Sequence, residues 1–191
     1  PGELFTVFRD YLFASQANFL DLPRSIQESA INFFKLIGIE TEPTTELVIK
    51  HLLNCAEKGT DVNKEVYSYL MSRANDQVIR RLKGKACLNL GEGRYVSPDE
   101  VFWSAHPFGR FRHQLSSEMR KYSDLLAKLD VRDAPQSKDA IAVLKELAAE
   151  YGSVGKTLDD QAKSVCIACW KMLTEGLVIE AISQQEIHKF A

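Results

Sequence analysis

Three cysteines and one histidine form the pattern in this sequence that could bind a metal. Cys166 and Cys169 form a CxxC pair, a spacing at which two thiolates can converge on zinc. His51 and Cys55 are four positions apart, which places both on one face of a helix, so they could complete the site. The CxxC pair, however, lies inside a helical pattern without a preceding strand. We expect core cysteines and no cofactor, and a zinc-stabilised helical domain is an alternative.

A second pattern could bind phosphate. Gly155, Lys156 and Thr157 are the residue types that close a P-loop, whose glycine-rich backbone surrounds phosphates. The motif requires four residues between its two glycines, whereas Gly152 precedes Gly155 by three positions. Residues 141–151 have the periodicity of a helix, where a P-loop needs a strand. The sequence therefore predicts an interhelix loop here.

A loop over residues 104–114 concentrates arginine, histidine and aromatic side chains. This is the composition of binding hot spots and of platforms for single-stranded nucleic acid. The candidate interaction residues are His106, Phe108, Arg110, Phe111, Arg112 and His113. The alternative is that Phe108 and Phe111 fill the seam between two helical units while Arg110 and Arg112 pair with local acids.

No spacing in the chain indicates a catalytic centre. Ser/His/Asp, Cys/His and paired-carboxylate arrangements are absent, and acidic pairs such as Asp99-Glu100 and Asp159-Asp160 stand where helix starts favour them. The sequence predicts that the protein is not an enzyme.

Composition limits the partners. The chain of 191 residues has 45% hydrophobic and 26% charged residues, which excludes disorder, and 24 basic against 26 acidic residues leave a net charge of −2. No global positive field would hold nucleic acid or anionic lipid. The apolar run at residues 31–39 is too short to cross a bilayer, the start lacks a signal-peptide pattern, and four cysteines suit a reducing compartment. We expect a fragment or processed chain in the cytoplasm, without membrane contact.

Helical periodicity dominates the first and last thirds. Helices are expected at residues 4–22, at 25–36 before Gly38, from Thr44 or Thr45 to Gly59, and at 62–82 with a break near Asn75. Further helices are expected at residues 118–129 after Ser116 or Ser117, from Ser137 to Gly152, and at 158–173, with a weaker pattern at 177–191. Residues 39–43 and 131–135 should be extended.

The centre has a different pattern. Residues 86–90 and 94–96 flank a Gly-Glu-Gly turn, which predicts a small β-hairpin. Ser97-Pro98-Asp99-Glu100 has a cap, a proline and two acids, so a short helical turn is expected to carry Val101 and Phe102.

An internal repeat relates the two helical parts. A shift of 92 positions aligns Pro43 with Pro135 and residues 33–43 with 125–135. The apolar residues Ile49, Leu52, Cys55 and Ala56 then fall on Ile141, Leu144, Leu147 and Ala148. The fold class expected is mainly α, with two related helical units and a small central hairpin. The segments are residues 1–83, 84–115 and 116–191.

The second copy also resembles a known family. Residues 88–102, followed by 115–122 and 125–131, are similar to the repeating regions of sacsin and sacsin-like proteins, with Asp130 where glycine is usual. The resemblance covers roughly residues 31–151. Such proteins join a GHKL-type ATPase fold to long helical segments, so the resemblance implies a non-catalytic helical segment. No nucleotide-binding residue carries over, because none of the ATPase motifs is present.

These observations predict a scaffold or protein-interaction segment of a larger sacsin-like, chaperone-type chain. Its partner would be a client protein or an adjacent domain of the parent chain. A nucleic-acid-associated helical module is a less favoured alternative. It would use Arg80, Arg81, Lys83, Arg110, Arg112 and His113.

Overall fold

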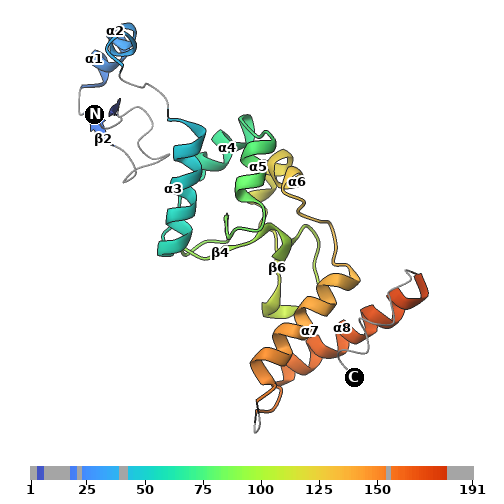
Figure 1. The fold of residues 1–191 in the computed structure, drawn as a ribbon. Coiled ribbons are helices and arrows are strands. Elements are labelled where there is room, and N and C mark those ends of the chain that lie inside the picture. Colours follow the sequence, from blue (N-terminus) through green and yellow to red (C-terminus); the bar gives the residue numbers. More distant parts are fainter. Residues whose placement is uncertain (1–3, 7–17, 21–22, 39–42, 154–155, 180–191) are drawn as a thin grey trace. The chain divides into compact units, whose positions relative to one another are not determined.

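The computed structural model describes residues 4–6, 18–20, 23–38, 43–153 and 156–179 (Figure 1). Within these residues the protein is mainly helical with small two-stranded sheets, which confirms the predicted fold class. Contacts group the chain into two compact units: unit 1 comprises residues 1–99 and 116–131, and unit 2 comprises residues 100–115 and 132–191. These units are interleaved along the chain, whereas the three predicted segments are continuous.

The N-terminal residues described are strands. β1 (Leu4–Thr6) pairs in parallel with β2 (Asn18–Leu20), so the predicted helix over residues 4–22 is wrong at both places. Aromatic and β-branched residues in these segments favour extended backbone, and no capping residue marks a helix start. The rest of that predicted helix lies outside the described residues.

The next predicted helix is present in two pieces. α1 (Arg24–Ser29) and α2 (Ile31–Leu36) are separated by Ala30, whose ψ of 14° interrupts the helix. Gly38 ends the segment as predicted, because its φ of 80° is the left-handed conformation that glycine adopts without strain.

α3 (Thr45–Lys58) confirms both predicted ends. The backbone N–H of Leu47 donates to the Thr44 side chain at 3.3 Å, and Gly59 closes the helix with φ 63°. Its buried residues are Leu47, Val48, Ile49, His51, Leu52 and Cys55. These positions follow the period of one helical face.

α4 (Glu65–Ser72) and α5 (Asp76–Leu82) follow, and both contact α3. The predicted break near Asn75 is confirmed. The Asn75 side chain accepts hydrogen bonds from the N–H groups of Gln77 and Val78, both at 3.0 Å, so it caps α5.

The predicted hairpin is formed by β3 (Leu88–Asn89) and β4 (Tyr95–Val96), which are antiparallel. Tyr67 of α4 fixes it to the helices: its hydroxyl donates to the Cys87 carbonyl and accepts from the Asn89 N–H, both at 2.9 Å. The turn approaches α3 so closely that a Cβ on Gly93 would lie 1.9 Å from the Gly59 carbonyl oxygen.

Unit 1 is completed by a helix from the second repeat copy. The 3-10 helix η5 (Met119–Tyr122) leads into α6 (Ser123–Lys128), and both contact α4. The Tyr122 hydroxyl donates to the Lys64 carbonyl at 2.9 Å, and the rings of Tyr67 and Tyr122 are 5.4 Å apart. Leu125, Leu126 and Leu129 are buried. The predicted helix over 118–129 therefore begins with a tighter turn.

Unit 2 begins with β5 (Val101–Phe102), which pairs in parallel with β6 (His113–Gln114). The 3-10 helix η3 (Pro98–Glu100) stops before Val101, so the expected helical turn does not carry Val101 and Phe102. Residues 104–114 also contain a second short 3-10 helix, η4 (Gly109–Phe111).

Two helices form the rest of unit 2, α7 (Ser137–Tyr151) and α8 (Asp160–Ile179), which pack against each other. The predicted Ser137 cap is wrong by one residue. Gln136 is the cap and forms a capping box with Asp139, whose buried carboxylate accepts from the Gln136 N–H at 2.7 Å and from Arg132. α8 starts two residues later than predicted, and the weak pattern beyond residue 179 lies outside the described residues.

Candidate functional site

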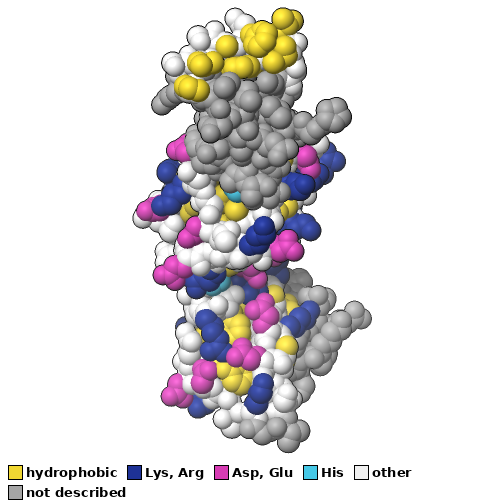
Figure 2. All heavy atoms as spheres, turned by 90° about the vertical axis from the view of Figure 1, so that its left-hand side faces the viewer, with side chains coloured by type: hydrophobic (Ala, Val, Ile, Leu, Met, Phe, Trp, Pro, Cys, Tyr) yellow, Lys and Arg dark blue, Asp and Glu magenta, His cyan; other side chains and the backbone are white. Residues whose placement is uncertain are grey.

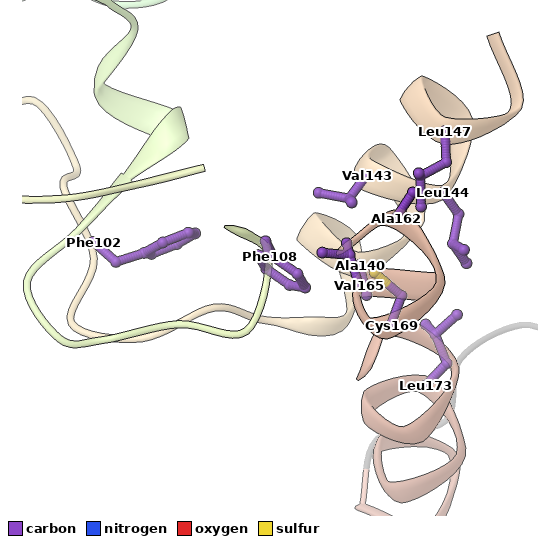
Figure 3. Close-up of a cluster of buried hydrophobic side chains, with 10 residues drawn as sticks. All are labelled: Phe102, Phe108, Ala140, Val143, Leu144, Leu147, Ala162, Val165, Cys169 and Leu173. Atoms are coloured by element: carbon purple, nitrogen blue, oxygen red, sulfur yellow. The ribbon is translucent and has the colours of Figure 1, made fainter. Parts of the chain in front are cut away.

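The predicted interaction loop is anchored in the core of unit 2. Phe102 and Phe108 are fully buried with their rings 6.4 Å apart, and both belong to the apolar cluster of α7 and α8 (Figure 3). The other buried members are Ala140, Val143, Leu144, Leu147, Ala162, Val165, Cys169 and Leu173. Phe108 is therefore a packing residue, and the expectation of a surface position is corrected.

Arg112 is also buried, with 5% of its side chain exposed. Its guanidinium makes a two-point ion pair with Glu146 of α7: Nη2 lies 2.9 Å from Oε1, and Nη1 donates to Oε2 at 3.1 Å. This pairing follows the alternative interpretation of the loop, in which the arginines bind local acids. Arg112 is not available to a partner of the folded protein.

Arg110 is 41% exposed and joins the loop to both helices of unit 2. Its guanidinium lies 2.5 Å from a Glu150 carboxylate oxygen and 3.4 Å from one of Asp159, and donates to the Tyr151 hydroxyl at 2.9 Å. The Tyr151 hydroxyl donates to Asp159 at 2.6 Å, and this bond is the main reason that the pKa of Asp159 is lowered. Arg110 is the most exposed of the six candidates.

His106, Phe111 and His113 are half-buried. The His106 ring lies 5.6 Å from the Phe102 ring, and its Nδ1 accepts from the Phe108 N–H at 3.3 Å. Burial is the main cause of a lowered pKa at His106, and the nearby cations His113 and Arg112 add to it. The six residues are thus brought together, and most of their side-chain surface serves to hold the loop on α7 and α8.

Charge reversal should separate the two arginines. We expect Arg110→Glu to change the free energy of unfolding by less than about 1 kcal/mol, because exposed ion pairs contribute little. Arg112→Glu should cost about 3–5 kcal/mol, since it buries a carboxylate against Glu146. Urea titration followed by tryptophan fluorescence measures both, because Trp103 and Trp170 both lie in unit 2. Equal losses for the two variants would contradict the assignment of Arg112 to the core.

The predicted metal ligands do not form a site among the described residues. His51 Nε2 and Cys55 Sγ are 3.7 Å apart and both side chains are buried, and burial lowers the pKa of His51. In the described part of the chain, no group of three or more His, Cys, Asp and Glu side chains is placed to hold a metal ion. The geometry of these residues therefore gives the zinc alternative no support.

Thiol reactivity should distinguish Cys166 from the other cysteines. Burial raises the pKa of the Cys87 and Cys169 thiols to about 12, so about one in ten thousand is a thiolate at pH 8. Cys55 is buried and Cys166 is partly exposed. We expect one fast-reacting thiol per native chain with a disulfide reagent at pH 8, and four in urea. Loss of the fast phase in Cys166→Ser would identify it, and two fast thiols would contradict this burial pattern.

The basic residues of the nucleic-acid alternative are paired with acids or carbonyls. Arg81 lies 2.5 Å from Glu46, Lys83 pairs with Asp130, and Arg80 Nε donates to the Asp76 carbonyl at 3.2 Å. With Arg110 and Arg112 paired as well, these side chains present little unbalanced positive charge to phosphates.

The Gly-Lys-Thr segment follows a helix, as predicted. α7 ends at Tyr151, and Lys156 Nζ donates to the Glu150 carbonyl at 3.0 Å, at the C-terminal end of α7. A P-loop needs the N-terminal end of a helix after a strand, so Lys156 does not have that setting.

A groove that the sequence analysis missed lies between α7 and α8. Its volume is about 320 Å³ and its lining is mainly apolar, with Leu144, Leu147 and Tyr151 from α7 and Cys166 and Trp170 from α8. Beside it, Ile167 is 69% exposed and Trp170 is 36% exposed. The signal was the excess of apolar residues in α8, which cover more than the one face needed for the core.

Unit 1 has a pocket of about 370 Å³ beside the hairpin. Its polar side chains bind one another: Asn89 Nδ2 donates to Asp61 at 2.8 Å, and Lys64 pairs with Glu118. The hydrogen bonds from Asn89 and from the Gly93 N–H are the largest causes of the lowered pKa of Asp61. These contacts fasten the hairpin and η5 to unit 1.

Comparisons with protein-family models, curated proteins and solved structures find no match for this chain. None of the helices described has the length and apolar character of a membrane span.

Proposed function

We propose that this chain is a non-catalytic helical scaffold of a larger sacsin-like protein, and that it binds protein through the groove between α7 and α8. The observation that carries the proposal is the mainly apolar groove with Ile167 and Trp170 exposed beside it. Apolar grooves between helices accept amphipathic helices, whose apolar side chains fill them. An intracellular location belongs to the same proposal, since all four cysteines are free thiols.

A protein partner fits this surface better than nucleic acid does. The groove is lined by leucine, tyrosine and tryptophan side chains, with Lys156 as its charged member. Tryptophan and tyrosine are enriched among residues that dominate protein–protein binding energy. The interaction surface thus shifts from the loop at residues 106–113 to the neighbouring groove, with Arg110 beside Tyr151 at its end.

Site-specific photo-crosslinking tests this proposal. A benzophenone amino acid at position 167 is expected to form adducts with protein in nuclease-treated lysate. The same group at Ser164, an exposed residue on another side of α8, should form few. Excess unlabelled parent chain should compete for the adducts, and excess Trp170→Glu chain should not. Equal labelling from positions 167 and 164 would contradict the proposal.

A further inference from the structure

The internal repeat is visible in the element bounds. The 92-position shift carries α2 onto α6 and the start of α3 onto the start of α7, and α7 is one residue longer than α3. Gly38 and its equivalent Asp130 both have positive φ, 80° and 63°. Thr44 and Gln136 are both N-caps, and each copy contains a parallel strand pair before its helices. The two copies therefore share one local fold.

Equivalent side chains of the two copies differ in burial. Leu125 and Leu129 are 1% and 2% exposed, whereas their equivalents Phe33 and Ile37 are 57% and 53% exposed. The cause is that α6 packs against α4. Leu36 beside them is 83% exposed, and apolar side chains of the N-terminal helices gather on the surface at the top of Figure 2. We call Phe33, Leu36 and Ile37 the donor face.

α8 has the complementary feature. It follows α7 as α4 follows α3, but no helix among the described residues of unit 2 packs on it as α6 packs on α4. Its core side carries Ala162, Val165, Cys169 and Leu173. The neighbouring side carries Cys166, Ile167 and Trp170, which we call the acceptor face.

We propose that the chain associates head to tail, with the donor face of one copy packed on the acceptor face of another, as α6 packs on α4 within unit 1. The inference rests on the proposed function, because it names the occupant of the same α8 surface. Donor and acceptor are different surfaces, so the contact is heterologous, and each added copy presents a new free face. Open chains of copies result, whose mean length increases with concentration.

Sedimentation of the 191-residue chain tests this inference. From about 10 µM to 1 mM, the range of weak association, the weight-average mass should increase without a plateau at the dimer. The donor variant Phe33→Asp, Ile37→Asp and the acceptor variant Ile167→Asp, Trp170→Asp should each remain monomeric. An equimolar mixture should form dimers and nothing larger, because each variant keeps one intact face.

Matched controls place an acid elsewhere on the same helices. Asn32→Asp in α2 and Ser164→Asp in α8 change exposed polar residues and should associate like the parent chain. Circular dichroism must show equal helix content in every variant. A parent chain that stays monomeric at 1 mM, or a variant that still dimerises alone, overturns the inference.

The two proposals fail separately. If the parent chain is monomeric while position 167 still crosslinks specifically to another protein, head-to-tail association is wrong and the protein-binding groove stands. If the parent chain is monomeric and no specific adduct forms, both are wrong.

Discussion

Gly93→Ala is expected to lower the free energy of unfolding of unit 1 by about 3 kcal/mol or more. The added Cβ would lie 1.9 Å from the Gly59 carbonyl oxygen and 2.4 Å from its carbon, and φ at Gly93 is 66°. Both obstacles are backbone atoms at the end of α3, which cannot rotate away as a flexible side chain does. Alanine in the left-handed region adds its own cost.

Gly91→Ala is the matched control. Gly91 lies in the same turn with φ 97°, and a Cβ there would meet no atom within 4 Å. It should therefore lose only the backbone part, about 1–2 kcal/mol. Urea unfolding followed by circular dichroism measures the two variants, with amide exchange of α3 and β4 as the local probe. Equal effects at Gly91 and Gly93 would show that the approach of hairpin to helix is not as close as described.

Phe108→Ala should destabilise unit 2 by about 3–5 kcal/mol, the usual cost of removing a fully buried phenylalanine. The ring packs within the cluster of α7 and α8, so its loss leaves a cavity and releases the loop at residues 104–114 (Figure 3). Tryptophan fluorescence reports on this unit alone, because Trp103 and Trp170 are the two tryptophans of the chain.

Phe111→Ala provides the comparison within the same loop. Phe111 is half-buried and packs on the edge of the cluster, so we expect a smaller loss, about 1–2 kcal/mol. If Phe108→Ala were no more destabilising than Phe111→Ala, Phe108 would not be the anchor of the loop.

Helix ends were the most predictable part of the fold. Thr44, Gly59 and Asn75 satisfy unpaired backbone groups by local chemistry, so short sequence patterns are sufficient to place them. The strands β1, β2, β5 and β6 were missed because they have only two or three residues. Such segments are too short for a periodicity, and their pairing joins residues more than ten positions apart.

The candidate site was located by composition but not resolved by it. Arg110 and Arg112 have the same residue type, yet one is 41% and the other 5% exposed. Arg112 has extended backbone, with φ −141° and ψ 168°, and which side chains of such a segment face the core depends on the helices packed against it. The groove between α7 and α8 was missed because it depends on how two helices pair, which the period of one helix does not determine.

The assignment of α6 to unit 1 means that inheritance and folding divide this chain differently. By sequence α6 belongs to the second copy, and by contacts it completes the unit built from the first. A gene duplication that added one more copy at the end would therefore supply the helix its predecessor lacks and leave its own last helix uncovered. Growth by duplication then preserves the same interface at every step, and selection for cohesion acts on pairs of neighbours rather than on single copies.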